Sequence, residues 1–400
     1  MKKHSFNIFN FICFVLFIFL HVGCQTDEIK ESLSNRTIIV YMIADNNLDN
    51  FSIQDINEIE EGWKDDFDGN LIVYIDRAEG ARPSHPIVYR IGHDTTQTIK
   101  SKIVQVYSEQ NSADPVIMNN VLSQIINEYP AQSYGLVLWS HGSAWFPNGT
   151  ELNNRKSNVR KFALPITKSF GKDGTNELNI IDLKNVLPLK FEFIIFDACY
   201  MGSVEVLYEL KNKADYIISS STEVLSSGYP YNLVVPFLFQ QTIDYKSVAN
   251  SFFESYFKLD GVMQSATVSV VKTSELTNLA KSVSEIMSDI NDIKLADYEH
   301  IQQYTTNDNK LLFDLKGFIT NTSQNSEKTR MFSEMLDKAV IFKVSTNKIL
   351  DELVINGFFG LSIFIPNSNN NKYYDFYKQY EWFKDFGYNN YFNKFNYNNQ

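Results

Sequence analysis

The chain has 400 residues, of which 44% are hydrophobic and 21% are charged, a composition that is ordinary for a folded globular protein. This length predicts one large domain with additions, or two closely packed units. The formal net charge of −11 excludes the basic surface that nucleic-acid-binding proteins use, so we expect no nucleic-acid partner.

Residues 1–23 have the pattern of a signal peptide. Lys2 and Lys3 give a positive start, and the apolar run IFNFICFVLFIFL follows at 8–20. A membrane-spanning helix needs about 20 apolar residues, and this run is shorter and contains Asn10. We therefore expect a cleaved export signal, with an uncleaved anchor as the alternative.

A lipidation motif follows the apolar run. The sequence HVGC at 21–24 resembles a bacterial lipobox, in which the chain is cut before a cysteine that then receives lipid. His21 replaces the aliphatic residue that is usual at the first position of this motif. We expect lipidation at Cys24, a linker over 24–36 and a lipid anchor in the bacterial cell envelope, with plain secretion as the alternative. The acidic stretch at 25–28 resembles a tag that directs lipoproteins to the outer surface.

Short apolar strands alternate with helices from residue 37 onward. TIIVYMIADNNLD (37–49) predicts a buried strand that runs into a polar turn. Further strands are expected at 69–76, 134–140, 191–197 and 214–221, with a short hairpin at 87–91 and 102–107. Helices are expected at 50–62, 114–129 and about 202–213, the second one capped by Asp114 with Pro115 at its first position.

This alternation predicts an α/β fold with a mostly parallel sheet and helices on both faces. Ligands of such sheets bind beyond the carboxyl ends of the strands. His141 follows the strand at 134–140, and Cys199 follows the strand at 191–197. Both residues therefore lie where a site is expected, although the sequence does not establish that these two strands are neighbours.

The half of the chain after residue 230 has weaker patterns. Strands are expected at 265–271, 339–345 and 360–366, with helices between them, and we assign this half to a smaller C-terminal packing unit. Residues 389–400, NNYFNKFNYNNQ, are rich in Asn and aromatic residues. We expect this tail to be loosely ordered.

Cysteine usage restricts the chemistry. The chain has three cysteines, of which Cys13 lies in the signal and Cys24 at the lipidation site. After processing, Cys199 has no partner for an intramolecular disulfide and no companions for a thiolate metal cluster. Cys199 is therefore either a small buried hydrophobic residue or a reactive thiol.

The surroundings of Cys199 favour the reactive thiol. A strand delivers Asp197, Ala198 and Cys199 to a turn, where backbone N–H groups can stabilise a thiolate and an oxyanion. A cysteine nucleophile also needs a base. His141 emerges from the preceding strand of the pattern, and Gly142 after it allows a tight turn of the backbone.

These segments resemble the clostripain family of cysteine peptidases, which has a caspase-like fold. The resemblance rests on LVLWSHGSAW (136–145) and FIIFDACYMGSVEVLYEL (193–210), with support from TIIVYMIADNNLDNF at the start and SSSTEVLSSGYPYN (219–232). It implies a caspase-like catalytic domain over 37–235, with 236–388 as the C-terminal part of the peptidase unit. It further implies an endopeptidase that cuts after Arg or Lys through a dyad, with His141 as base and acid and Cys199 as nucleophile. Gly142 and Cys199 would supply oxyanion donors through their backbone N–H groups.

The resemblance makes Asp197 the candidate floor of the pocket for the basic side chain of the substrate. A carboxylate two residues before the nucleophile points to the same face of the strand and can pair with a guanidinium or ammonium group. The alternative is a buried acid that accepts hydrogen bonds from nearby backbone N–H groups. Glu223 is a weaker candidate for a second acid, and its alternative is a solvated loop residue.

The interval between the two catalytic blocks is basic, polar and without apolar periodicity, over residues 146–179. Relatives in the family are matured by cleavage in this interval, so we expect self-processing after Arg155 or Lys156. We expect no cofactor, while the calcium dependence of some relatives leaves a calcium requirement open. Two other functions stay open: a catalytically silent lipoprotein binding module with the same fold, and a hydrolase or transferase that acts on a non-peptide acyl group.

Overall fold

The computed structural model describes residues 33–83, 85–148, 150, 152, 171–289, 291–305, 310–366 and 371–398. The expected signal peptide, Cys24 and the expected cleavage residues Arg155 and Lys156 lie outside these ranges. From Ser34 onward the chain forms one compact unit. None of the helices in the described ranges has both the length and the apolar content needed to cross a membrane.

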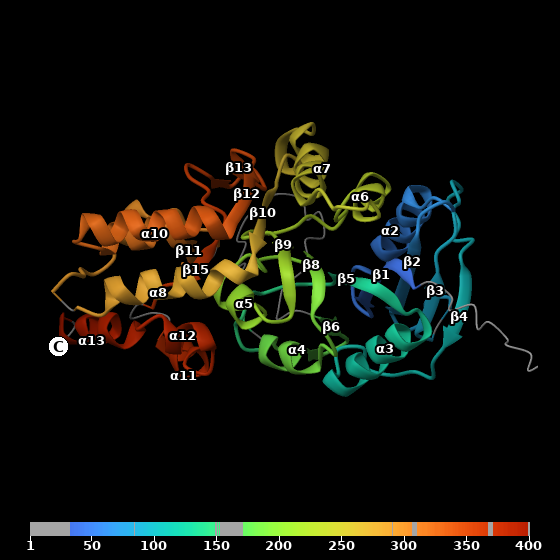
Figure 1. Cartoon of the computed structure of the whole chain (residues 1–400), viewed down its shortest axis with the longest axis horizontal. Coiled ribbons are helices and arrows are strands. Elements are labelled where there is room, and N and C mark those ends of the chain that lie inside the picture. The colour runs from blue at the N-terminus through green and yellow to red at the C-terminus, as the bar shows by residue number, and fades with distance from the viewer. Residues whose placement is uncertain are drawn as a thin grey trace, which may run out of the picture. The chain divides into compact units, whose positions relative to one another are not determined.

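A nine-stranded mixed sheet organises this unit (Figure 1). Its strands, in the order in which they lie, are β12 (Val340–Ser345), β10 (Thr267–Lys272), β9 (Ala214–Ser219), β8 (Phe191–Asp197), β5 (Ala131–Trp139), β1 (Ser34–Ala44), β2 (Gly69–Arg77), β3 (Ile87–Arg90) and β4 (Lys102–Val106). The five strands from β9 to β2 run parallel to one another. The two strands at each edge of the sheet pair with their neighbours in the antiparallel direction. The α/β class and the mostly parallel sheet are therefore confirmed.

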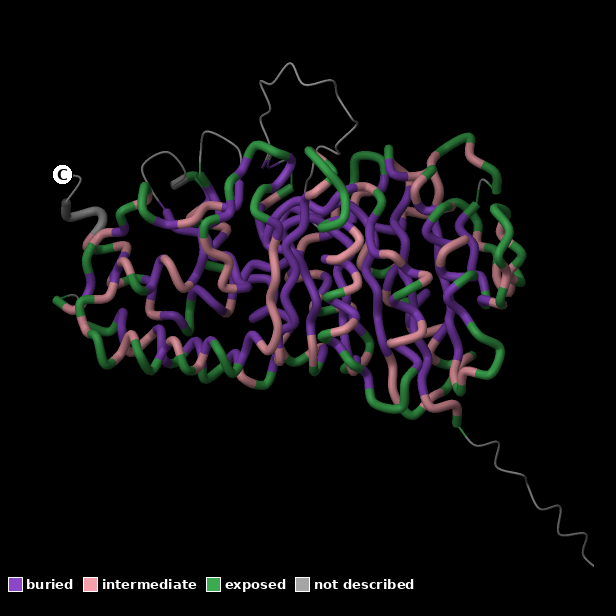
Figure 2. The backbone as a smooth tube through the Cα atoms, turned by 90° about the horizontal axis from the view of Figure 1, so that it is seen from above, coloured by how far each residue is buried: buried purple, intermediate pink, exposed green. Residues whose placement is uncertain are grey.

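The apolar sequence of the central strands follows from burial on both faces. All residues of β1 from Arg36 to Ala44 are buried, so the strand reads as a continuous apolar run instead of an alternating one. Figure 2 shows the buried backbone concentrated in the strands, with exposed backbone in the turns that join the elements. Strand sequence of this kind is what made the central sheet predictable.

Helices cover both faces of the sheet (Figure 1). One layer contains α2 (Asp49–Gly62), α6 (Tyr231–Leu238) and α7 (Tyr245–Phe257), and the other contains α3 (Pro115–Glu128), α4 (Ile180–Val186) and α5 (Val204–Glu209). The Asp114 side chain accepts hydrogen bonds from the N–H groups of Val116 and Ile117, so α3 begins at the cap that its sequence predicts.

The C-terminal part of the chain, 236–388, extends the same sheet through β10 and β12. Its remaining helices are α8 (Leu276–Met287), α9 (Leu315–Thr322), α10 (Ser326–Ala339), α11 (Tyr374–Tyr377) and α12 (Glu381–Asp385). The strand expected at 360–366 is shortened to β15 (Ser362–Phe364), which pairs with β11 (Leu312–Asp314) outside the main sheet. Two further two-stranded ladders join β13 (Lys348–Ile349) to β14 (Leu353–Val354) and β6 (Lys172–Asp173) to β7 (Asn176–Glu177).

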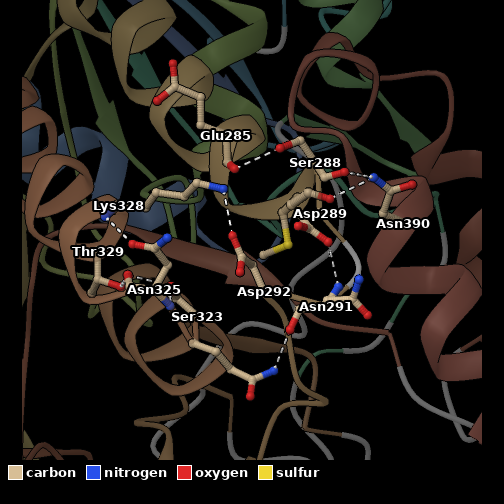
Figure 3. Close-up of polar contacts among 12 residues, drawn as sticks. Glu285, Ser288, Asp289, Asn291, Asp292, Ser323, Asn325, Lys328, Thr329 and Asn390 are labelled. Atoms are coloured by element: carbon tan, nitrogen blue, oxygen red, sulfur yellow. Dashed lines mark hydrogen bonds and ion pairs between the residues drawn. The ribbon is translucent and has the colours of Figure 1, made fainter.

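The expectation of a loosely ordered tail needs correction, because α13 covers Tyr388–Asn398. Tyr391 of this tail and Tyr388 directly before it are fully buried, so both residues contribute to the core. The Asn390 amide donates hydrogen bonds to the carbonyls of Met287 (2.8 Å) and Ser288 (3.1 Å) at the end of α8, the second of which is drawn in Figure 3. Asn390 therefore serves as a cap of α8, and Tyr391 as a packing group.

A polar network holds the helices of this part together (Figure 3). The Lys328 ammonium of α10 donates to Asp292 in the loop after α8, at 2.9 Å. The Asn325 side chain caps α10 by accepting from the N–H of Lys328 at 3.1 Å. The Gln324 amide donates to the carbonyl of Asn291 at 3.0 Å. These contacts link successive helices, so we assign the network a structural role.

Candidate active site

Strands β5 and β8 are neighbours, which places the two candidate catalytic residues side by side. The strands pair in parallel with Trp139 opposite Asp197, and the N–H of Ser140 donates to the Asp197 carbonyl at 3.3 Å. His141 and Cys199 each lie two residues beyond this pair, on the adjoining loops. Both residues line one cavity at the carboxyl edge of the parallel strands.

Gly142 lies against the backbone of the nucleophile. A Cβ at this position would be 2.2 Å from the Cys199 carbonyl oxygen and 2.9 Å from its nitrogen. Contacts under 3.0 Å with backbone atoms cannot be relieved by a side-chain rotation. Only glycine therefore allows the His141 loop to approach the Cys199 loop this closely.

The Cys199 thiol is buried at a turn that the loop after β9 stabilises. Its relative exposure is 4%, and it forms no disulfide in the described part of the chain. The N–H of Val224 donates to Sγ at 3.2 Å, which favours a thiolate, while the thiol donates to the Val224 carbonyl at 3.5 Å, which favours the protonated form. Tyr200 adopts a left-handed conformation (φ 62°), and its N–H donates to the Thr222 carbonyl at 2.9 Å. Strain of this kind is typical of functional turns.

Burial keeps the His141 imidazole in its neutral form. The residue is 1% exposed, and burial, helped by the charge of Lys172, lowers its pKa from the ordinary 6.5 to about 3. Nε2 lies 2.8 Å from Oδ1 of Asn47, and among the described residues Nδ1 has no hydrogen-bond partner. The ring therefore has one nitrogen engaged by the turn after β1 and one nitrogen available for a proton.

Asp197 forms a buried acidic group in the same cavity. Its Oδ2 accepts hydrogen bonds from the Tyr231 hydroxyl (2.8 Å) and the Tyr229 N–H (3.2 Å). Among the described residues Oδ1 accepts no hydrogen bond, so it can accept from a ligand. Burial raises the pKa of Asp197 to about 6, although the two hydrogen bonds oppose the increase.

A second buried acid, Asp55 of α2, lies near Asp197. Asp55 accepts a hydrogen bond from the Trp139 indole at 2.6 Å, and its relative exposure is 2%. Burial raises its pKa well above the ordinary value, and the negative charge of Asp197 adds to the increase. Sequence reasoning missed Asp55, because its position in an amphipathic helix gives no sign of a partner on β5.

The cavity between these groups is narrow. It measures about 20 Å³ and is lined by Leu48, Trp139, Ser140, His141, Asp197, Ala198, Cys199, Val224, Leu225 and Ser226. A volume of this size is enough to hold an ordered water molecule. Val224, Leu225 and Ser226 belong to one loop after β9 and form the wall next to the sulfur.

Glu223, the other acid that the sequence singles out, does not line this cavity. It is 4% exposed, so the solvated alternative is wrong, and it directly precedes the wall residue Val224. In the described ranges, no group of three or more His, Cys, Asp or Glu side chains is arranged to hold a metal ion.

Comparisons with known proteins agree with this geometry. The model of the clostripain family matches residues 40–397. Clostripain of Hathewaya histolytica is 27% identical over 230 residues, which are 51% of this chain but only 42% of that protein. The match therefore spans less than half of the length of this relative.

Two solved structures match over most of the chain. A secreted C11 cysteine protease from Bacteroides thetaiotaomicron, solved with an irreversible peptide inhibitor, is 32% identical, with a TM-score of 0.72, over 89% of this chain and 99% of the other. An inactive zymogen C11 protease from Parabacteroides distasonis is 31% identical, with a TM-score of 0.72, over 88% and 98%. This chain therefore belongs to the clostripain family of cysteine peptidases and has the caspase-like fold of that family.

Proposed function

We propose that the chain is a cysteine endopeptidase that cleaves after Arg or Lys, with His141 as base and Cys199 as nucleophile. The main support is the pairing of β5 with β8, which brings the two residues to one cavity. The buried carboxylate of Asp197 in the same cavity supports a basic residue before the cut. The match to this chain covers only 42% of clostripain, so the similarity to clostripain alone does not establish this specificity.

In the proposed reaction His141 takes the thiol proton of Cys199, and the sulfur attacks the carbonyl carbon of the scissile bond. The backbone N–H groups of Gly142 and Cys199 donate to the oxyanion that forms. The C–N bond then breaks, and His141 returns the proton to the leaving amine, which leaves a thioester on Cys199. A water molecule gives a proton to His141 and attacks the thioester, which releases the acid and restores the thiol.

Substitution of the dyad tests this proposal. Cys199→Ala should abolish cleavage of peptides with Lys or Arg before the cut, and His141→Ala should reduce kcat at least ~10²-fold. His300→Ala is a matched control, because His300 is exposed and pairs only with Asp297, and its activity should equal that of the wild type. Near-normal turnover by either dyad variant would contradict the assignment.

Labelling of the thiol separates a peptidase from a silent binding module. A chloromethyl ketone with a Lys or Arg side chain should alkylate Cys199 of the wild type rapidly, and the His141→Ala variant slowly. A binding module would lack this difference.

We further propose self-processing after Arg155 or Lys156. The relative solved as an inactive zymogen supports a maturation step in this family. The cut would lie between the His141 and Cys199 loops. On a denaturing gel, wild type should give two fragments, whereas Cys199→Ala should give one intact band. An intact and fully active wild type would contradict processing in this interval.

We also propose export and a lipid anchor at Cys24. The secreted relative from Bacteroides thetaiotaomicron supports export, while the lipobox-like HVGC supports acylation. One acylated cysteine would then tether the protein to the membrane. Cys24→Ser should release the protein from the membrane fraction or leave it misprocessed. Unchanged membrane fractionation of this variant would contradict lipidation.

A further inference from the structure

The turn between β1 and α2 places an amide beside the catalytic histidine. Asn47 is exposed, yet its Oδ1 lies 2.8 Å from Nε2 of the buried His141, a residue 94 positions later in the chain. The exposed Asn47 side chain thus contacts Nε2 of the His141 ring, while the other ring nitrogen, Nδ1, is buried. Asn47 does not line the cavity, so it can act on the reaction only through His141.

The contact specifies which ring nitrogen has the proton. A carbonyl oxygen can only accept a hydrogen bond, so Nε2 donates and Nδ1 keeps its lone pair. Nδ1 is buried and has no hydrogen-bond partner among the described residues. It is therefore the ring nitrogen that can accept the thiol proton.

Neighbouring groups hold Asn47 in this position. The Asn46 side chain accepts from the Leu48 N–H (2.9 Å) and donates to the carbonyls of Ile43 (3.0 Å) and Lys172 (2.7 Å). Leu48 is buried and lines the cavity. Asn46 thus connects the turn to β1 and β6 by hydrogen bonds, while the Asn47 side chain contacts His141.

We propose that Asn47 is a positioning residue that holds His141 in the Nε2–H tautomer with Nδ1 directed to the reaction, so that the working unit is Asn47–His141–Cys199. This proposal rests on the proposed function, since it assigns a third member to the same site. After Nδ1 takes the thiol proton, the ring is a cation with N–H groups on both nitrogens, and Oδ1 then accepts from a charged donor. The bond is therefore stronger in the ion pair than in the neutral ring.

The charged and titratable groups around His141 come from three elements. Lys172 of β6 disfavours the imidazolium, while Asp197 and Cys199, at the end of β8 and on its adjoining loop, line the same cavity. Asn47 has no charge, so its removal changes the pH profile only through the hydrogen bond. A carboxylate at this position would favour the imidazolium.

The experiment compares Asn47→Ala, Asn47→Asp and Asn46→Ala in the full chain. We measure kcat and KM against pH for a peptide with Lys before the cut, and the rate of iodoacetamide alkylation of Cys199 by mass spectrometry. Asn47→Ala should lower kcat about 10-fold or more, with KM within about two-fold, because only proton transfer is affected. Asn47→Asp should recover most of the kcat and move the alkaline limb of the pH profile upward.

Asn46→Ala loosens the turn that holds Asn47 but leaves the Asn47 side chain present, so it should lower thermal stability and shift the pH profiles less than Asn47→Ala does. The proposal is overturned if folded Asn47→Ala keeps the kcat and pH profile of the wild type, or if Asn47→Asp is as impaired as Asn47→Ala. If the wild type cleaves no peptide, the proposed function fails, but the alkylation profiles still decide the role of Asn47.

Discussion

Among single residues, Asp197 has a geometry that suits both of the roles that the sequence presents as alternatives. Its Oδ2 accepts from the Tyr231 hydroxyl and the Tyr229 N–H, as a structural acid would, while Oδ1 is left for a ligand. A second acid, Asp55, lies in the same region, and burial and the charge of Asp197 favour its neutral form. A substrate cation next to Asp197 would pair with its buried charge, which makes binding of a basic side chain favourable despite burial.

This arrangement predicts a pH-dependent KM. Since the pKa of Asp197 is raised to about 6, the carboxyl is neutral below this pH and charged above it. KM for peptides with Lys or Arg before the cut should therefore rise as pH falls through about 6. The lost charge-assisted bond is worth roughly 1.5–3 kcal/mol, or about 10-fold to 100-fold in KM. Steady-state kinetics between pH 5 and pH 8 measure this change.

Peptides with a neutral residue before the cut provide the comparison. Their KM should not follow the titration, and Asp197→Asn should remove the pH dependence for basic peptides. If Asp197→Asn reduces the cleavage of basic and neutral peptides equally, Asp197 has only the structural role of holding the Tyr229–Tyr231 segment.

Gly142 gives a second prediction. Because a Cβ would lie 2.2 Å from the Cys199 carbonyl oxygen, Gly142→Ala must push the His141 and Cys199 loops apart. We expect a loss of about 1–3 kcal/mol in the free energy of unfolding and a large loss of kcat. Urea unfolding and peptide cleavage measure the two effects. Gly92→Ala is the control, since a Cβ there meets no atom within 4 Å; equal behaviour of both variants would contradict the close approach.

The residues that sequence reasoning found and missed differ in one respect. His141, Cys199 and Asp197 follow or end apolar strands, so position along the chain was enough to select them. Asn47 and Tyr231 contact these residues across 94 and 34 positions, in a polar turn and a helix start respectively. Nothing in a local pattern indicates which side chain the fold brings to such a partner.

Between elements, the C-terminal part anchors the loops that hold the dyad. Trp145, four residues after His141, packs against Tyr377 and Phe364 with ring centroids at 4.7 and 5.1 Å, and its carbonyl accepts from the Tyr380 hydroxyl at 3.0 Å. Trp145 is thus a packing residue. These partners lie more than 200 residues further along the chain, which explains why the sequence did not connect the C-terminal part with the site.

The nucleophile loop has a similar anchor in Glu205 of α5. Oε1 accepts from the Phe364 N–H (2.9 Å) and the Tyr377 hydroxyl (3.1 Å), while Oε2 has no hydrogen-bond partner among the described residues. The residue is fully buried, and burial raises its pKa from 4.5 to about 7. A buried acid that connects α5 to β15 and α11 is therefore neutral in acidic solution.

This shift predicts how stability depends on pH. The folded state binds the Glu205 proton more tightly than the unfolded chain does. The contribution of this proton to the free energy of unfolding is therefore fully present below pH 4.5 and is lost as pH rises through about 7. The change amounts to roughly 3 kcal/mol. Glu205→Gln should remove this slope and be more stable, relative to wild type, at pH 8 than at pH 4.5. Urea unfolding at both values measures the difference, and parallel profiles would refute the assignment.

In the molecule as a whole, the central sheet was predictable and its edges were less so. The runs at 37–44 and 191–197 are mostly apolar because helices cover both faces, and such runs are easily recognised. The run at 360–366 has the same composition but pairs with β11, since composition does not specify a partner. The tail was misjudged because Tyr391 is buried by segments that its own sequence cannot reveal.

The order of strands has a consequence for self-processing. A cut between β5 and β8 would divide the sheet at that strand pair, with β5, β1, β2, β3 and β4 on one fragment and β8, β9, β10 and β12 on the other. His141 and Cys199 would then belong to different fragments. Activity after processing therefore requires that the fragments stay together.

Buried contacts across this division favour association. Arg36 of β1, 3% exposed, donates to Glu192 of β8 at 2.9 Å and to the carbonyls of Leu238 and Gln240 at 2.9 and 3.1 Å. The contacts of Trp145 with Tyr377 also cross it. We expect the processed enzyme to elute in gel filtration as one species with the mass of the intact chain.

Arg36→Ala tests whether these contacts hold the fragments together. Loss of Arg36 leaves Glu192 and two carbonyls without this donor. Because Glu192 is partly exposed, we expect the free energy of association of the two fragments to weaken by on the order of 2 kcal/mol. The processed Arg36→Ala enzyme should lose activity on dilution, whereas the processed wild type should not. The control adds Arg155→Ala and Lys156→Ala to Arg36→Ala, so that the chain stays uncut and its activity cannot depend on concentration. Dilution losses in the uncut control, or none in the processed variant, would show that the interface does not depend on Arg36.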